Sequence, residues 1–400
     1  MGMLATADRT VYIHSMAMTT PPAGQRAISR DEAPRPEHAA RTPTKGRGTV
    51  WAIEHRYARQ TAESYDDGWG TLDQEAEQER LGPETQVIEE RVKSIIAKND
   101  SPDLDFDLSV NPYRGCEHGC IYCFARPTHS YLGMSPGVDF ETRIIAKVNA
   151  AERLREALAA RSYVCSPINV GSATDAYQPA ERKLGITRSV VEVMSECAQP
   201  FSVVTKSSGI ERDLDLVAPM AVRGLVAVYV SVTSLDPALA RILEPRAAAP
   251  HRRLRTIETL ARAGVPVGVS VSPIIPFINE PEIERILEAA AAAGATAAFG
   301  IVLRLPWEVN PLFQRWLDQH FPDRAARVMA RVREMRGGKD YDSSFGARMR
   351  GEGVWAELIA QRLAKARRRF GLDVKRRDLD VGQFRKPLPS ATAGQGDLFA

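Results

Sequence analysis

The 400 residues comprise 44% hydrophobic and 26% charged side chains, a composition typical of a globular protein with a large core. The formal net charge is only +3, which excludes a polycation that binds nucleic acid along its whole length. No apolar stretch is long enough to cross a bilayer, and residues 1–50 lack the apolar block of a secretion signal. We therefore expect a cytoplasmic protein with no membrane partner.

The beginning of the chain shows little regular patterning. Residues 1–50 are rich in Pro, Thr, Ala and Arg without helical or strand periodicity, so we expect them to be disordered. Residues 51–104 are interpreted as an N-terminal extension that folds against the next domain. Within this extension only Glu84–Ala97 has helical apolar spacing, which predicts one helix there.

From residue 105 the sequence alternates between apolar, strand-like runs and helix-like segments. The alternation predicts parallel β/α units that close into a full or partial barrel over residues 105–306. Gly264 and Gly294 suit left-handed caps at the ends of two helices. Residues 307–386 are expected to form a mostly helical extension, and residues 387–400 a flexible tail. The predicted strands are Pro167–Ser172, Phe201–Lys206, Leu225–Thr233, Val265–Ile275 and Ala297–Leu303, and the predicted helices are Ile145–Ala160, Thr187–Cys197, Ile210–Met220, Pro250–Ala263 and Glu280–Ala293.

Three of the five cysteines, Cys116, Cys120 and Cys123, lie within eight residues of one another. An odd number of cysteines in a cytosolic chain argues against a disulfide framework. Three thiolates at this spacing can hold one metal centre from a single loop, and Gly115 and Gly119 permit tight turns. A cubane iron–sulfur cluster normally takes four cysteines. With three, one iron stays open for an exogenous ligand, as catalysis requires.

Other interpretations of the cysteines remain open at this point. A structural zinc site could use His118 or His129 as its fourth ligand, although the usual pairing of two CxxC motifs is absent. The three thiols could also be ordinary buried residues. Of the remaining two, Cys197 is expected in the core, and Cys165, just before a predicted strand, is ambiguous.

The CxxxCxxC spacing with Tyr122 before its last cysteine resembles the radical S-adenosylmethionine (SAM) superfamily. The stretch from about Asp105 to Phe277 is similar to the spore photoproduct lyase-like branch. This resemblance implies an α/β fold, a partial TIM-type (β/α) barrel with the cluster loop after its first strand. It also implies a 4Fe–4S cluster and SAM as cofactors, with an electron donor such as flavodoxin or ferredoxin. The expected activity is reductive cleavage of SAM to a 5′-deoxyadenosyl radical at the carboxyl ends of the strands.

The resemblance also suggests which residues contact SAM. Tyr122 is expected near the adenine, and Lys206 beside the methionyl carboxylate. The end of the second strand offers Thr174 and Asp175 to the amino and ribose groups. The remaining candidates for cofactor binding are Ser172, Ser231, Thr233 and Arg246.

One departure from the family bears on the reaction. Spore photoproduct lyases carry a hydrogen-donating cysteine at the end of the second strand, where this chain has Ser172. A serine O–H bond is too strong for that role, and Cys165 is expected at the wrong end of the strand. The resemblance therefore predicts how the reaction starts and leaves the catalytic hydrogen donor unassigned.

Two features favour nucleic acid, in DNA repair or base modification, as the target. The basic segment Arg362–Arg377 could neutralise several phosphates, or could simply be a solvated helix face. The tail residues Gln395, Leu398 and Phe399 resemble the short peptide by which bacterial repair proteins dock on the sliding clamp. The alternatives are a radical SAM enzyme that modifies RNA or protein, and a non-catalytic, clamp-associated module with a structural metal.

Overall fold

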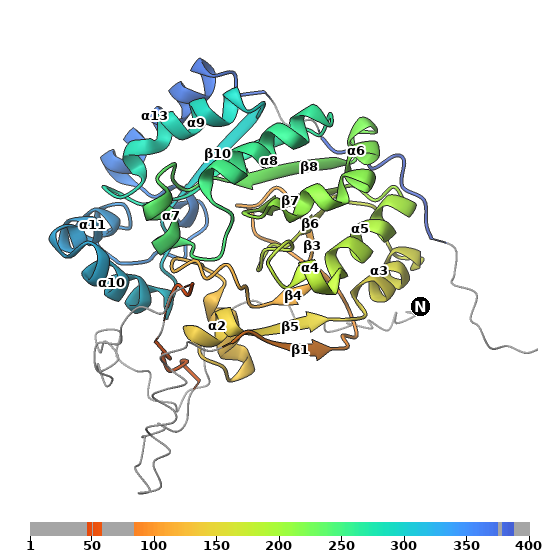
Figure 1. The fold of residues 1–400 in the computed structure, drawn as a ribbon, viewed down its shortest axis with the longest axis horizontal. Helices are drawn as coiled ribbons and strands as arrows, with labels where there is room; N and C mark the ends of the chain where they lie inside the picture. Colours follow the sequence, from red (N-terminus) through yellow and green to blue (C-terminus); the bar gives the residue numbers. More distant parts are fainter. Residues whose placement is uncertain (1–45, 50, 58–83, 375–377, 388–400) are drawn as a thin grey trace, which may run out of the picture. The chain divides into compact units, whose positions relative to one another are not determined.

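The computed structural model describes residues 46–49, 51–57, 84–374 and 378–387, all within the unit His38–Ala400. Strands and helices alternate through most of this range (Figure 1). None of the helices in the described ranges is long and apolar enough to span a membrane. The strands are β1 (Gln86–Glu90), β2 (Ile96–Lys98), β3 (Leu108–Val110), β4 (Tyr113–Arg114), β5 (Arg143–Lys147), β6 (Ile168–Val170), β7 (Phe201–Thr205), β8 (Val226–Ser231), β9 (Val267–Ile274) and β10 (Ala297–Val302).

Helices occupy most of the connections between these strands and more than half of the described C-terminal region. The α-helices are α2 (Val138–Thr142), α3 (Ala150–Ala159), α4 (Glu181–Leu184), α5 (Ile186–Glu196), α6 (Leu214–Val222), α7 (Pro237–Leu243), α8 (Pro250–Arg262), α9 (Ile283–Ala292), α10 (Val309–His320), α11 (Pro322–Glu334), α12 (Ala347–Arg350) and α13 (Gly353–Arg369). Three short 3-10 helices are η1 (Arg126–Leu132), η2 (Ser208–Asp213) and η3 (Glu280–Glu282).

The main sheet has seven strands in the order β10-β9-β8-β7-β6-β3-β2. Every neighbouring pair from β3 to β10 is parallel, and only β2 runs antiparallel at the edge. Since the described strands β10 and β2 form the two edges of this sheet, the architecture is the partial TIM-type barrel expected from the sequence. The carboxyl ends of β3 to β10 therefore meet along one edge.

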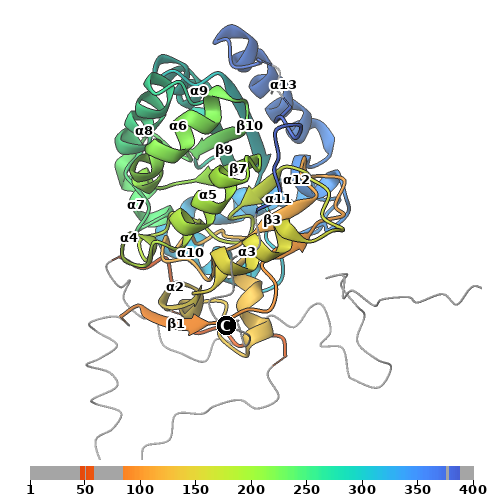
Figure 2. The same ribbon diagram turned by 90° about the vertical axis from the view of Figure 1, so that its right-hand side faces the viewer.

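The two faces of the main sheet differ in character. One face carries the valines and isoleucines of alternate positions, such as Val170, Val203 and Val228, which pack under α5, α6, α8 and α9 (Figures 1 and 2). The other face carries smaller or polar side chains, where Asn169 donates to Ser202 Oγ at 3.1 Å. Period-two alternation thus separates a core facing the helices from a polar inner face.

A second apolar cluster joins the C-terminal helices to the cysteine loop. Trp316 of α10 is buried and donates from Nε1 to the carbonyl of Ile242 at 3.1 Å. Ile121, between the second and third cysteines, packs into the same cluster. The helical region after residue 307 was predicted correctly, and its packing fixes the loop that bears the cysteines.

Of the predicted helices, one was wrong entirely and another was wrong in part. Residues Glu84–Ala97 contain β1 and the start of β2, with no helix between them. The predicted helix Ile145–Ala160 begins only at Ala150, because Arg143–Lys147 forms β5 between β1 and β4. Pairing with distant strands decides these segments, and local periodicity does not reveal it. The five predicted barrel strands are confirmed within two residues at either end, as are the left-handed caps at Gly264 and Gly294.

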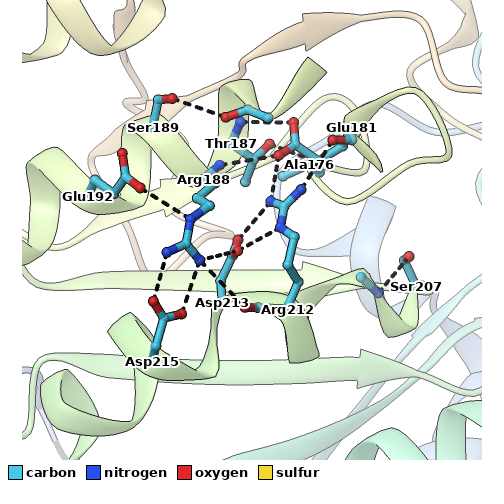
Figure 3. A network of polar contacts seen from close by, with 12 residues as sticks. Ala176, Glu181, Thr187, Arg188, Ser189, Glu192, Ser207, Arg212, Asp213 and Asp215 are labelled. Carbon is cyan, nitrogen blue, oxygen red and sulfur yellow. Dashed lines mark hydrogen bonds and ion pairs between the residues drawn. The ribbon is translucent and has the colours of Figure 1, made fainter. Parts of the chain in front are cut away.

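A polar network fastens the segment after β6 to the helices beyond it (Figure 3). The buried Glu181 carboxylate accepts from the Thr187 amide at 2.9 Å, from Arg212 at 2.7 Å and from the Tyr113 hydroxyl. Arg212 also bonds Asp213 at 2.7 Å. The network therefore fixes a loop whose other residues lie beside the cysteines.

We expect Glu181→Ala to lower the free energy of unfolding by about 3 kcal/mol, because it leaves buried donors without an acceptor. The matched control is Asp215→Ala, which removes an exposed partner of Arg188 and should cost little. Urea titrations of both variants test the difference. An equal loss of stability in the two variants would contradict a structural role for the buried carboxylate.

Candidate active site

The cysteine loop begins directly after β4 and is held from several sides. The Cys116 amide donates to the Phe140 carbonyl at 2.9 Å, and the Ile121 amide to the Leu243 carbonyl at 3.1 Å. Gly115 and Gly119 have φ values of +78° and +67°. A Cβ at Gly119 would lie 2.8 Å from a carboxylate oxygen of Glu141, so both conformation and space require glycine. The two predicted tight turns are confirmed.

The loop brings the three cysteine thiols close to one another. Cys116 and Cys120 are buried, and Cys123 is half-buried. Burial, with the neighbouring charges of Asp175 and the other two thiols, raises the pKa of Cys116, and burial raises the pKa of Cys120 to about 12. The Asp175 amide donates toward the Cys116 sulfur. Thiols gathered in this way become thiolates when a metal centre binds them, so the donor set fits a cluster with three cysteine ligands.

A single zinc ion fits less well. Among the described residues there is no group of three or more His, Cys, Asp or Glu side chains that could hold one metal ion. His118 Nδ1 lies 3.3 Å from Asp175 and His129 Nε2 lies 3.1 Å from the Arg143 carbonyl, so each imidazole is held in place through one ring nitrogen. In a cubane each cysteine bonds a different iron, so its thiolates stand farther apart than around one ion.

Arg126 lies directly against the cysteine loop and is fully buried. Its Nε donates to the Cys120 carbonyl at 2.9 Å, and its Nη2 donates to the Gly119 carbonyl at 3.3 Å. The same guanidinium pairs with the buried carboxylate of Glu141, which accepts from the Gly48 amide at 2.9 Å. Burial raises the pKa of Glu141, against the effect of Arg126. This ion pair fixes the backbone that presents Cys120.

The loop after β6 lies against the cysteine loop. Thr174 donates to the Gly115 carbonyl at 2.7 Å, and Gln178 donates to that carbonyl at 3.2 Å. Gln178 also accepts from the Glu117 amide at 2.9 Å. Thr174, expected to contact SAM, therefore uses its hydroxyl proton to hold the loop that carries Cys116.

Asp175 is surrounded by donors. Its carboxylate accepts from the Lys206 amide at 2.8 Å, the Thr205 hydroxyl at 2.8 Å and the Tyr177 amide at 2.9 Å, and it contacts His118. Burial alone would raise the pKa of Asp175, but His118 and the other donors lower it to about 2. Since its oxygens already serve four partners, Asp175 joins the loops and has little capacity left for a ligand.

Lys206 follows β7 and lies next to Tyr122. Its Nζ is 5.9 Å from the centre of the Tyr122 ring, and the described residues give this ammonium no hydrogen bond. Burial alone would lower the pKa of Lys206, but the charges of Cys120 and Glu244 outweigh it and raise the pKa. The structure therefore brings together the predicted cation, the predicted aromatic ring and one cluster cysteine.

A buried carboxylate that we did not predict lies beside this group. Glu244 accepts from the hydroxyls of Tyr122 and Thr233 and pairs with the buried Arg253. Burial opposes its ionisation, but Arg253 and Lys206 lower the pKa of Glu244 to about 2. Glu244 stands two residues before Arg246, so its place near the site could have been inferred; the partner Arg253, on α8, gave no signal in the sequence.

The remaining four residues that were predicted to contact SAM are Ser172, Ser231, Thr233 and Arg246. Ser172 accepts from Asn111 Nδ2 at 3.0 Å and is half-buried, while Ser231 ends β8 on the polar inner face. Thr233 was expected at the end of the predicted strand Leu225–Thr233, but β8 ends two residues earlier, at Ser231. Arg246 pairs with Glu117 at 3.0 Å and donates to Thr85.

The basic segment of α13 runs from the carboxyl side of the sheet, where Arg362 contacts the residues that follow β9, to the amino end of β10. Arg362 is held by Glu280 and by Glu284, the latter at 2.7 Å. After the helix, Asp373 forms a β-bridge with Ala297, the first residue of β10. The cysteine loop instead follows β4, beyond the carboxyl end of β3. Residues 375–377 and the tail with Gln395, Leu398 and Phe399 lie outside the described residues.

The two other cysteines are separate from the site. Cys165 lies before β6 and Ser172 after it, so they occupy opposite ends of that strand, as the sequence suggested. Cys165 donates weakly to Gln199 Oε1 at 3.6 Å. Cys197 is buried at the end of α5, as expected for a core residue.

Comparisons with known proteins agree with this architecture. A family model described as the Radical SAM superfamily matches residues 110–290. An uncharacterized protein of Mycobacterium tuberculosis is 36% identical over 234 residues, which are 58% of this chain and 68% of the relative. An uncharacterized protein of Methanocaldococcus jannaschii is 23% identical over 246 residues, 61% of this chain and 86% of the relative.

Among solved structures, a spore photoproduct lyase in complex with a dinucleoside spore photoproduct has a similar fold. Its TM-score is 0.52 at 16% sequence identity, over 71% of this chain and 79% of that chain. The family match begins at Val110 and includes the three cysteines, the loop after β6 that carries Asp175, and Lys206 after β7. The chain is thus an enzyme that belongs to the radical SAM superfamily.

Proposed function

We propose that this enzyme holds a 4Fe–4S cluster on Cys116, Cys120 and Cys123, binds SAM beside it and acts on nucleic acid. The observation that carries the proposal is one arrangement at the carboxyl edge of the sheet. Three thiols gather in one loop, and Lys206, a cation without a hydrogen-bond partner among the described residues, lies beside Cys120. Membership of the superfamily makes the chain an enzyme, so the non-catalytic module is set aside.

When bound, a reduced cluster with one open iron supplies the electron that cleaves SAM to a 5′-deoxyadenosyl radical, and a carrier such as flavodoxin or ferredoxin would supply the reducing electron. The protein's part is to position and to shield. Arg126 holds the carbonyls of Gly119 and Cys120, and Thr174 and Gln178 hold the carbonyl of Gly115. The apolar cluster that includes Ile121 excludes water from one side of the loop.

Of the eight predicted SAM contacts, we infer that Lys206, Ser172, Ser231 and Tyr122 lie against the cofactor. Lys206 would pair with the methionyl carboxylate as a compact cation, and the hydroxyls of Ser172 and Ser231 would bond polar groups of SAM. Tyr122 would offer its ring, since its hydroxyl is bonded to Glu244. The other four join separate loops and strands of the protein, and we assign them to positioning: Thr174, Asp175, Thr233 and Arg246.

Nucleic acid is proposed as the target on the fold similarity and on the chemistry of the exposed residues described below. The solved structure of similar fold contains a dinucleoside spore photoproduct. Ser172 stands where the lyases carry a hydrogen-donating cysteine, so we do not extend their complete reaction to this chain. RNA or protein modification is the alternative that an activity measurement decides.

We further propose that the tail residues Gln395, Leu398 and Phe399 dock on a bacterial sliding clamp. The two apolar side chains would fill a pocket on the clamp, and the glutamine would form hydrogen bonds at its rim. The proposal rests on the sequence of the tail, which lies outside the described residues.

The cluster and the substrate class can be tested in one experiment. Anaerobically reconstituted protein should hold about four irons per chain, and after reduction it should release more 5′-deoxyadenosine with DNA or RNA pools than with peptides. Cys120→Ala should lose both iron and SAM cleavage, because one ligand is removed. Cys165→Ala is the matched control and should keep both, since Cys165 lies at the other end of β6.

Two results would contradict this proposal in different ways. A Cys120→Ala protein with its full iron content would remove the assignment of the cluster ligands. Stimulation of 5′-deoxyadenosine release by peptides alone would keep the cluster and replace nucleic acid with protein as the target.

We expect Lys206→Gln to weaken SAM binding by about tenfold or more, because a hydrogen bond to a charged carboxylate contributes about 1.5–3 kcal/mol. Equilibrium dialysis with labelled SAM measures the affinity, and iron content shows whether the cluster is retained. Lys386→Gln is the control, since Lys386 is exposed and donates to the Ala160 carbonyl. Unchanged SAM affinity in an iron-replete Lys206→Gln protein would rule out the contact.

Removing Gln395–Ala400 should abolish binding to a bacterial sliding clamp while SAM cleavage continues, because the tail is far in sequence from the cysteine loop. Surface plasmon resonance with immobilised clamp measures the first, and 5′-deoxyadenosine release the second. Equal clamp affinity of the full and shortened chains would refute this docking.

A further inference from the structure

Two segments lead away from the cysteine loop side by side. One runs from Phe124 to Tyr131, and the other from Arg304 to Glu308, just after β10. They meet where the Arg304 guanidinium lies 5.1 Å from the Phe124 ring, and again where Ser130 Oγ donates to Glu308 at 3.2 Å. Phe124 follows Cys123 directly, so this pair of segments starts at the proposed cluster.

Three exposed aromatic rings gather farther along, two of them on these segments and the third, Tyr57, on the N-terminal piece of the described chain. Tyr131, Tyr57 and Trp307 surround the guanidinium of Arg56, whose Cζ lies 4.4 Å from the Trp307 ring centre, 4.9 Å from Tyr57 and 5.2 Å from Tyr131. The exposed fractions are 59% for Tyr131, 51% for Tyr57 and 45% for Trp307. We call Phe124, Tyr131, Tyr57 and Trp307 the aromatic strip.

The charge at the centre of these rings is already balanced. Arg56 Nη1 donates to both oxygens of Glu308, at 3.0 and 2.9 Å. Arg56 therefore orients the rings through cation–π contacts and adds little net charge to the surface. What the strip offers a ligand is flat aromatic area.

The backbone of Trp307 adopts an unfavourable conformation although its side chain is exposed. Its φ is +45°, in the left-handed region that a bulky side chain rarely adopts. Burial of the ring does not offset the conformational energy, since the side chain remains 45% exposed. Strain of this kind persists where the surroundings impose it and is concentrated at functional sites.

Arg304 gives the strip one cation beside Phe124. Its Nε is buried without a hydrogen-bond partner among the described residues, and its Nη1 reaches only the Met349 sulfur at 3.3 Å. The described part of the chain shows no ion pair to Arg304. A guanidinium with unused donors next to an exposed ring suits a phosphate.

We propose that the aromatic strip binds an unpaired segment of nucleic acid, with bases stacked on Tyr131, Trp307 and Phe124 and a phosphate on Arg304. This inference rests on the proposed nucleic-acid target and names how it is held. Every base has a face that stacks on an aromatic ring, so the strip needs no particular sequence. A base at the Phe124 end would lie beside the cysteine loop, where the proposed chemistry takes place.

The test is binding of a fluorescein-labelled oligomer of about twelve deoxythymidines, within the usual range of site sizes for such surfaces, to the iron-replete protein. Fluorescence anisotropy at several salt concentrations gives the affinity and its salt dependence. Tyr131→Leu and Trp307→Leu should each weaken binding by about tenfold, because each removes one stacking surface. Neither should change the slope of affinity against salt, since no phosphate contact is lost. Arg304→Gln should lower that slope by about one.

Matched variants separate stacking from general damage. Phe384→Leu removes a ring that pairs with Tyr163 near the amino end of β6, and it should bind as the wild type does. Tyr131→Phe keeps the ring and should restore affinity. If a leucine variant fails to fold, Trp307→Phe provides a second measurement, because it should remove the part of the tryptophan fluorescence that the oligonucleotide quenches.

The outcomes distinguish this inference from the proposed target. Wild-type affinity in both leucine variants, or unchanged quenching in Trp307→Phe, would overturn the strip and leave a nucleic-acid target standing. If the leucine variants lose affinity only together with a lower slope of affinity against salt concentration, the stacking contact would be overturned. If the wild type binds no oligonucleotide and responds only to peptides, both proposals fail.

Discussion

The Asp175 carboxylate joins three parts of the chain that only the fold brings together. It accepts hydrogen bonds from the Lys206 amide and the Thr205 hydroxyl at the end of β7, and from an amide of its own loop after β6. It also contacts the imidazole of His118 in the cysteine loop. Because one side chain serves all three, the distance from the cysteines to Lys206 depends on it. The thiols and the proposed SAM-binding cation are thereby positioned as a unit.

Buried charge around the cysteine loop has the same effect in two further places. Arg126 pairs with Glu141 against the loop itself, and Arg253 pairs with Glu244 beside Tyr122. Buried ion pairs add little net stability compared with apolar residues of the same volume, but losing one partner is costly. We interpret these pairs as fixing one geometry of the loop, since each guanidinium also bonds backbone carbonyls of the site.

The sequence was sufficient for the parallel strands and the cysteine loop, because both are local patterns. It failed at Glu84–Ala97 and at Arg143–Lys147, where β1 and β5 pair with each other across more than 50 residues. Among the candidate residues, sequence position was enough to propose Lys206 and Tyr122, which lie next to each other beside Cys120. It could not show that Thr174, Asp175 and Thr233 are occupied by the protein, since their hydrogen-bond partners, such as Thr205 for Asp175 and Glu244 for Thr233, come from other elements.

The positive charge that was expected to bind substrate does not gather around the cysteine loop. The basic segment Arg362–Arg377 was predicted to suit phosphates, yet Arg362 is bound to two glutamates, and the chain after α13 lies at the amino end of β10. Near the cysteines the surface offers exposed rings and Arg304, which has no ion pair among the described residues. We propose that a ligand bound near the cysteine loop contacts the rings and Arg304. On this proposal, recognition near the cysteines depends on stacking more than on charge, and any contact of the basic helix with the ligand lies at a distance from the site.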